Sequence, residues 1–289
     1  MALWFFASDL HGSSGRYAAL FDCIERQRPS AVLLGGDLLP GAREVLDAVD
    51  AGPAGFISGW LGPRLRALRA RLGRDTPRLL LILGNDDPRI QEPPLMEGAA
   101  EGLWDYVHAR RVEVDGFAVF GYAYVPPSPF LLKDWERYDV GRHVDPGCVS
   151  PEEGLRSVAV APDESRYSTI HDDLEKLFGA HDLSQAVLLA HGPPYRTHLD
   201  RADIDGRFVD HVRVDPHVGS AALREFIESR QPRITLHGHI HESPRLTGDW
   251  RDRIGRTWCF SAAHDGPELA LVRFDPAAPE SATRTLIEA

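Results

Sequence analysis

Five short apolar runs constrain the fold of this chain more than any other feature of its sequence. They occupy residues 3–7, 31–35, 79–83, 186–190 and 233–236. Each run is continuous rather than alternating, which is typical of strands that are buried on both faces. The spacing of apolar residues also predicts helices over 13–28, 61–72 and 219–232. Strand, helix and strand in succession indicate βαβ units and a parallel or mixed sheet.

Other segments predict additional strands. Residues 112–125 contain two β-rich pieces joined by Asp115-Gly116, which is a hairpin signal. Residues 256–263 and 268–275 form a second candidate pair near the end of the chain. These strands favour a second sheet packed on the first, within a single domain over 1–289. Residues 126–167 and 194–218 show no regular pattern, so we expect irregular loop insertions with a functional role there.

Charge and composition exclude several classes of protein. The net charge of −11 argues against a nucleic-acid or membrane-surface binder. The start of the sequence, MALWFFASDL, lacks the features of a signal peptide, and no apolar stretch is long enough to span a bilayer. The three cysteines share no CxxC spacing and are odd in number, which favours a reducing compartment. We therefore expect a cytoplasmic protein.

Each of the five runs is followed within a few residues by side chains that can bind metal. In chain order these are Asp9 and His11, then Asp37, then Asn85, Asp86 and Asp87, then His191, and finally His239 and His241. Because ligands bind beyond the carboxyl ends of strands in open α/β sheets, we expect these side chains to meet at one edge of one sheet.

The chemistry of these residues suits a phosphoester. Carboxylate, amide and imidazole groups together bind Mn, Fe, Zn, Co or Ni. Hydrolysis by two metals requires ions about 3.5–4 Å apart, and a shared carboxylate can hold them that close. Asp37 is the candidate for the shared ligand, since its strand is expected to lie centrally. Two divalent ions would leave the site net positive, which favours an anionic phosphate and activates a water molecule as the nucleophile.

Taken in order, the motifs DLH, GGD, GND, HGPP and GHIH between residues 8 and 242 resemble those of the calcineurin-like metallophosphoesterases, which read DxH, GD, GNH, Hx and GHxH. The resemblance implies a four-layer α/β/β/α sandwich of two mixed sheets, a binuclear centre and attack by a hydroxide that bridges two divalent metals, with manganese preferred. Carried over motif by motif, one metal would be held by Asp9, His11, Asp37 and His241, and the other by Asp37, Asn85, His191 and His239. His237 precedes the motif and is expected to be only a neighbour. The stretches around HGPP and GHIH also resemble a small branch of the family that contains several phosphodiesterases.

The sequence departs from the family at two positions. Asp86 stands where the family has the histidine of GNH, a proton donor to the leaving group, and Pro40 stands where many members have the second aspartate of GDxxD. Asp86 can act as an acid if burial raises its pKa. The interpretation we favour is that it stays ionised, pairs with an arginine and takes no part in chemistry. A phosphodiester, which carries less charge, would suffer least from a missing acid.

Several alternatives stay open from the sequence alone. His217 caps the entry to the following helix, faces solvent or contacts the substrate. Asp87-Pro88 is most simply a turn. The preferred function is a metal-dependent phosphodiesterase acting on a small phosphorylated substrate. The alternatives are a phosphomonoesterase acting on nucleotides or phosphoproteins, and a scaffold that binds metal without turnover. The scaffold is disfavoured because all seven expected metal ligands are present.

Overall fold

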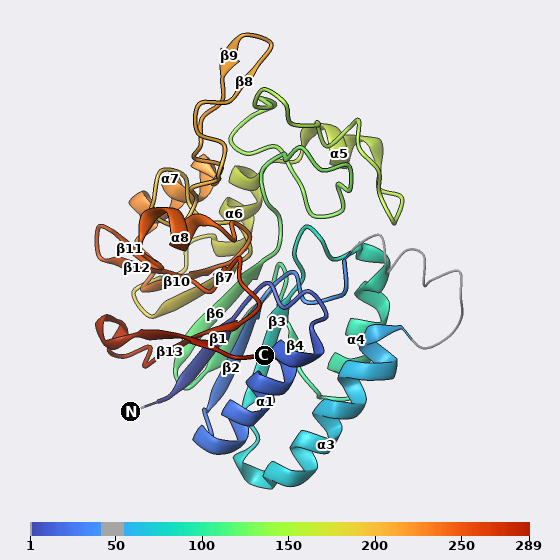
Figure 1. The fold of residues 1–289 in the computed structure, drawn as a ribbon, viewed down its shortest axis with the longest axis vertical. Coiled ribbons are helices and arrows are strands. Elements are labelled where there is room, and N and C mark those ends of the chain that lie inside the picture. Colours follow the sequence, from blue (N-terminus) through green and yellow to red (C-terminus); the bar gives the residue numbers. More distant parts are fainter. Residues whose placement is uncertain (1, 42–54) are drawn as a thin grey trace.

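The computed structural model describes residues 2–41 and 55–289, which form two six-stranded sheets and a short two-stranded hairpin. Figure 1 shows helices α1, α3 and α4 beside one sheet and helices α6 and α7 beside the other. The strands are β1 Trp4–Ala7, β2 Ala31–Gly35, β3 Arg78–Ile82, β4 Asp105–Tyr106, β5 Arg111–Val114, β6 Phe117–Tyr122, β7 Ala186–Ala190, β8 Phe208–Val209, β9 Val212–Arg213, β10 Ile234–His237, β11 Arg251–Ile254, β12 Thr257–Ser261, β13 Leu269–Phe274 and β14 Thr283–Ile287. The α-helices are α1 Ser14–Gln27, α3 Gly62–Leu72, α4 Glu92–Ala100, α5 Pro162–Tyr167, α6 Ile170–Phe178, α7 Ala221–Arg230 and α8 Ser243–Thr247.

The two sheets, here called sheet A and sheet B, are both mixed. Sheet A has the order β14-β13-β1-β2-β3-β4, with β1 to β4 parallel and β13 and β14 antiparallel at one side. Sheet B has the order β11-β12-β10-β7-β6-β5. Its four inner strands are parallel and its two edge strands are antiparallel to their neighbours. The predicted four-layer α/β/β/α sandwich is confirmed.

Two predictions about the arrangement of the strands are wrong, one about sheet membership and one about pairing. The five apolar runs do not end at one edge of one sheet, because β1, β2 and β3 belong to sheet A while β7 and β10 belong to sheet B. The strands β12 and β13 do not pair with each other either. β12 joins β10 in sheet B, and β13 crosses to sheet A and joins β1. An apolar run shows that a strand is buried, but it does not identify the strand's partner.

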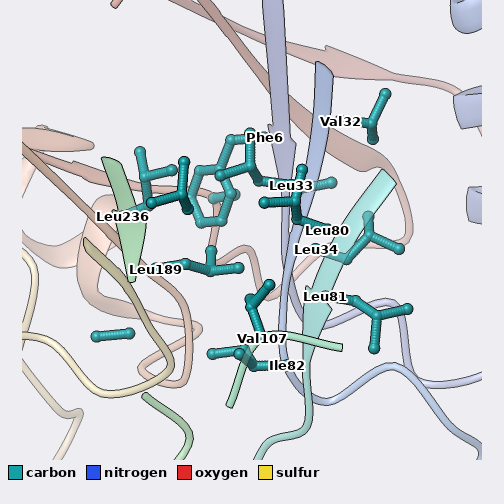
Figure 2. Packing of buried hydrophobic residues seen from close by; sticks show 14 of the residues in the cluster. Phe6, Val32, Leu33, Leu34, Leu80, Leu81, Ile82, Val107, Leu189 and Leu236 are labelled. Atoms are coloured by element: carbon teal, nitrogen blue, oxygen red, sulfur yellow. The ribbon is translucent and has the colours of Figure 1, made fainter. Parts of the chain in front are cut away.

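The space between the sheets is filled by the apolar runs themselves. Phe6 of β1 and Leu236 of β10 are fully buried and belong to one hydrophobic core that includes residues of both sheets. Figure 2 shows part of this core, with Leu189 and Leu236 from sheet B and Phe6 and Leu33 from sheet A. Continuous burial explains why these strands read as uninterrupted apolar sequence.

The helices begin at residues that can cap them. Ser13 precedes α1 and accepts a hydrogen bond from the backbone N–H of Arg16, and Ser220 does the same for α7 with the N–H of Leu223. These caps satisfy amide groups that the helices leave unpaired. No helix in the described ranges is both long enough and apolar enough to cross a membrane.

Candidate metal centre

The structure brings the seven predicted metal ligands together where the two sheets meet. Asp9 and His11 follow β1, Asp37 follows β2, and Asn85 follows β3, all in sheet A. From sheet B, His191 follows β7 directly, and His239 and His241 follow β10. The carboxyl ends of the parallel strands therefore supply every candidate ligand, as the general rule for such sheets predicts.

A first group of ligands consists of Asp9, His11, Asp37 and His241. Each offers one donor atom, and these atoms all lie within 4.8 Å of one another. His241 Nε2 lies 3.3 Å from Asp9 Oδ1 and 3.3 Å from His11 Nε2. Two imidazole nitrogens this close, facing two carboxylates, form the donor set of a first-row divalent cation.

A second group contains Asp37, His191 and His239, whose donor atoms also lie within 4.8 Å of one another. Asn85 adjoins this group, with its Oδ1 at 3.0 Å from His191 Nε2. His191 Nε2 lies 3.4 Å from Asp37 Oδ2. Asp37 thus belongs to both groups.

Local contacts hold the ligands in these orientations. His191 donates from Nδ1 to the carbonyl oxygen of Gly35 at 2.8 Å, which directs its Nε2 toward Asp37. The backbone N–H of His239 donates to Asp9 Oδ1 at 3.0 Å. Gly84 leaves room for the shared ligand, because a Cβ at this position would lie 2.3 Å from Asp37 Oδ1.

The backbone at four candidate ligands is in the left-handed region, which residues with a Cβ rarely adopt. The φ angles of Asp9, His11, Asp37 and His239 are 57°, 45°, 51° and 72°. Such conformations cost on the order of 1–3 kcal/mol each and tend to occur at functional sites. The surrounding tertiary structure therefore maintains an arrangement that the local sequence disfavours.

The acidic and basic groups of the site shift one another's pKa values. Burial would raise the pKa of Asp9, but its contacts with His241 and the charge of His191 together outweigh burial, and the pKa lies below its ordinary value. The pKa of Asp37 is likewise lowered despite burial, chiefly by the charge of His191 and its hydrogen bond. Burial would lower the pKa of His191, yet the charge of Asp37 raises it to about 9. Buried carboxylates that raise the pKa of a neighbouring histidine also favour the binding of a metal cation.

The residues present fit a divalent metal. Within the described ranges, Asp9 Oδ2 is one of two buried side-chain polar atoms with no hydrogen-bond partner, the other being Arg284 Nε. A buried carboxylate oxygen without a partner is costly unless another group satisfies it. Since Asp9 belongs to the first group of ligands, a cation there would supply the missing interaction.

The aspartates at positions 86 and 87 lie in different environments. Asp86 keeps a side chain that is 40% exposed, and its Oδ2 lies 3.4 Å from Nδ1 of His11. Asp87 closes the expected turn, donating its N–H to the carbonyl of Gly84 at 3.1 Å. Its carboxylate is also fully buried and accepts hydrogen bonds from the backbone N–H groups of Leu38, Leu39 and Gly84. Asp87 therefore joins the two loops that carry Asp37 and Asn85.

His217 does not cap helix α7, because Ser220 occupies that position. Its Nδ1 lies 2.9 Å from Oδ1 of Asp200, a fully buried carboxylate that also accepts backbone hydrogen bonds from Arg196, Thr197 and Gly219. A quarter of the His217 side chain is exposed.

His237 is a neighbour of the ligands, in agreement with the sequence interpretation. It is fully buried and contacts the carbonyl oxygen of Gly192 through Nδ1 and the Thr235 hydroxyl through Nε2. With both ring nitrogens used, His237 connects β10 to the loop after His191.

Sequence reasoning missed Asp87 and Asp200 as organising residues. Both are carboxylates that accept several backbone N–H groups of irregular loops, and such contacts leave no periodic pattern. One signal was available for Asp200, since it lies within the irregular segment 194–218, where unpaired backbone groups need acceptors.

Comparison with known proteins shows a family relationship. A family model described as calcineurin-like phosphoesterase matches residues 5–243. An uncharacterized protein from Methanocaldococcus jannaschii is 37% identical over 78 residues, which is 26% of this chain and 30% of that protein's own length. The crystal structure of TT1561 from Thermus thermophilus superposes with a TM-score of 0.56 at 15% identity, covering 99% of this chain and 98% of that one. Another solved structure gives a TM-score of 0.58 with the same identity and coverage. The structural matches support the same fold.

Proposed function

Because this chain belongs to the calcineurin-like phosphoesterase family, we propose that it hydrolyses phosphodiesters with the help of two divalent cations. The observation that supports this proposal best is the position of Asp37, whose carboxylate takes part in both groups of ligands. A shared carboxylate can hold two cations at the separation of about 3.5–4 Å that in-line displacement at phosphorus requires.

The proposed ligands divide between two sites. Asp9, His11, Asp37 and His241 would hold the first cation, and Asp37, Asn85, His191 and His239 the second. When bound, the cations would polarise the phosphate and make water a nucleophile near neutral pH. Manganese is the cation we favour among Mn, Fe, Zn, Co and Ni.

The residues of the chain itself determine how the substrate is held. With two dications, the site carries a net positive charge and attracts an anionic phosphate. No histidine occupies the position of the family's proton donor, where this chain has Asp86. A diester would suffer least from that loss, because the oxygen leaves from a less charged phosphate. The positive charge would attract either kind of phosphoester, so the preference for diesters over monoesters rests on the identity of residue 86.

We assign substrate contact to His217. Hydrogen bonds attach both ends of the loop that carries His217 to segments that follow candidate ligands. Ser220 pairs with the backbone of Pro193 and Tyr195, after His191. Arg201 N–H donates to the Ser243 hydroxyl at 2.9 Å, after His241. Asp200 holds Nδ1, so Nε2 is the nitrogen left to contact a phosphate oxygen or the leaving group.

The first test compares bis-p-nitrophenyl phosphate with p-nitrophenyl phosphate, using chelated protein resupplied with Mn²⁺. The proposal expects faster hydrolysis of the diester, no turnover without metal and no turnover by Asp37→Asn. Preference for the monoester would contradict the diester assignment and favour a monoesterase. Bound metal with no hydrolysis of either substrate would instead favour a metal-binding scaffold.

A second test addresses His217 directly. His217→Gln should lower kcat for the diester by about 10²–10³-fold if its Nε2 assists the leaving group. Asp200→Asn is a less specific test, because the same carboxylate also accepts the backbone N–H groups of Arg196, Thr197 and Gly219 and so organises the loop. His143→Gln is a matched control, since that side chain is 83% exposed and pairs with the exposed Asp145. Unchanged kinetics in His217→Gln would remove this residue from the site.

A further inference from the structure

The ring of His11 has its two nitrogens in different surroundings. Nε2 faces the first group of ligands, at 3.3 Å from His241 Nε2 and 4.0 Å from Asp37 Oδ2. Nδ1 faces the opposite way and lies 3.4 Å from Asp86 Oδ2. A neutral imidazole presents a lone pair at only one nitrogen, so a metal at Nε2 requires the proton at Nδ1.

We propose that Asp86 is a positioning residue, which holds His11 with Nδ1 protonated and Nε2 directed at the first cation. This inference rests on the proposed metal centre and assigns Asp86 a role other than proton donor. A carboxylate that accepts the second N–H of a histidine ligand fixes the tautomer and the ring orientation, and makes the ligand more basic.

His191, another candidate ligand, has its ring oriented by a backbone carbonyl rather than by a carboxylate. His191 is fully buried and directs its Nδ1 at the carbonyl of Gly35. His11 is 27% exposed, and within residues 2–41 and 55–289 the group facing its Nδ1 is the Asp86 carboxylate at 3.4 Å. A side-chain carboxylate therefore does for His11 what a backbone carbonyl does for His191.

Asp86 is itself held in place for this role. Its backbone N–H donates to Asp37 Oδ1 at 2.8 Å, so the residue that contacts His11 is attached to the shared ligand. The next residue, Asp87, ties the same turn to the loop after β2 through the N–H groups of Leu38 and Leu39. These contacts fix the backbone of the turn from which the Asp86 carboxylate reaches His11.

Loss of Asp86 should affect the affinities of the two cations differently. His11 belongs only to the first group of ligands, so loss of Asp86 should weaken the first cation and spare the second. Losing an outer partner of a metal ligand typically lowers metal affinity by about 10–100-fold. A proton donor, in contrast, would leave both affinities unchanged and would affect turnover alone.

The experiment measures stepwise binding of Mn²⁺ by calorimetry and the visible spectrum of the Co²⁺-loaded protein, without substrate. Asp86→Ala should weaken one binding step by about 10–100-fold and change the Co²⁺ spectrum. Asp86→Asn keeps an acceptor oxygen for Nδ1, so its loss should be smaller. Asp105→Ala is the matched control, because Asp105 is 34% exposed and pairs with Arg78 at the start of β3.

The measured affinities distinguish a positioning role of Asp86 from a role as an acid. Equal affinities in the wild type and in Asp86→Ala would overturn the positioning role, and a lower kcat in both Asp86 variants would then identify an acid. Weakening of both steps, or equal losses in the alanine and asparagine variants, would also contradict the inference. Two cations bound by the wild type without any hydrolysis would refute the proposed function and leave the inference intact.

Discussion

The indole Nε1 of Trp135 donates a hydrogen bond of 2.8 Å to the backbone carbonyl of Asp87, and both side chains are fully buried. This bond joins the irregular segment 126–167 to the turn that carries Asn85. Asp134, beside Trp135, adds a second connection by accepting the backbone N–H of Arg89 at 2.8 Å. The segment without sequence pattern therefore supports the turn of one candidate metal ligand.

Replacing Asp87 with alanine should destabilise the metal-free protein strongly. The change leaves the N–H groups of Leu38, Leu39 and Gly84 buried without an acceptor, at a cost of about 3 kcal/mol or more in the free energy of unfolding. Asp87→Asn keeps one acceptor oxygen, so its free energy of unfolding should lie between those of the wild type and Asp87→Ala. Urea denaturation measures the difference. Asp75→Ala, at an exposed ion pair with Arg28, should change stability by less than about 0.5 kcal/mol. Similar losses in Asp75→Ala and Asp87→Ala would contradict this account.

The buried pair Lys133 and Glu136 should be sensitive to the loss of one partner. Both side chains are fully buried, with Nζ at 2.5 Å from Oε2, and Ser128 supplies further hydrogen bonds to the carboxylate. Burial raises the pKa of Glu136 despite the nearby ammonium group. Lys133→Met removes the compensating charge and should cost about 3–5 kcal/mol.

A double-mutant cycle tests this interpretation of the pair. Adding Glu136→Gln to Lys133→Met should recover part of the loss, because no unpaired charge then stays buried. Thermal denaturation of the two single variants and the double variant gives the coupling energy. Strictly additive losses would show that the charges are not coupled.

His108 should make the protein less stable in mild acid. The ring accepts the N–H of Ala123 at Nδ1 and packs against Trp135. Burial, together with the nearby charges of Arg137 and Arg89, lowers its pKa from 6.5 to about 3. Below pH 6.5 the unfolded chain binds a proton that the folded chain does not, so stability falls from pH 6.5 toward pH 3. At pH 5 the loss from this residue should be roughly 1–2 kcal/mol relative to pH 7.

The matching variant is His108→Asn, which keeps an acceptor near the same position but does not titrate. Its free energy of unfolding should depend less steeply on pH between 5 and 7 than that of the wild type. Both are measured on metal-free protein, so that the titration of the ligand histidines cancels in the difference. Parallel pH profiles would assign the acid sensitivity to other groups.

Single ligand substitutions should separate the two cations. Asp37→Asn removes a ligand of both groups and should weaken both binding steps, each by more than about 100-fold, since the loss of an outer partner alone costs 10–100-fold. Asp9→Asn should affect only the first step and His239→Ala only the second. Equilibrium dialysis with metal analysis measures the stoichiometry. One cation retained by Asp37→Asn at full affinity would contradict the shared role.

Much of the fold was predictable from the sequence, because the continuous apolar runs coincide with β1, β2, β3, β7 and β10 to within a residue or two. The assignment of strands to sheets was not predictable from these runs. Side chains buried on both faces look alike in sheet A and sheet B, so nothing in the sequence of β12 or β13 indicates that the chain crosses between sheets. That the whole of 1–289 forms one domain stays a prediction.

The candidate ligands were predictable because each follows directly after a strand and belongs to a recognisable motif. Their supporting residues were not. Asp87, Asp200 and Lys133 are buried charged residues whose partners are backbone groups or residues in irregular segments. Propensity and periodicity describe regular elements, whereas these contacts depend on how the loops pack in three dimensions.

Each group of candidate ligands draws side chains from both sheets: Asp9, His11 and Asp37 face His241, and Asp37 faces His191 and His239. A cation bound at either group therefore ties one half of the sandwich to the other. Metal occupancy and folding then form a single linked equilibrium, in which a free metal concentration 100 times the dissociation constant adds about 2.7 kcal/mol to stability. The supply of metal in the surroundings becomes one of the variables that decide how long the folded chain persists, independently of any substrate.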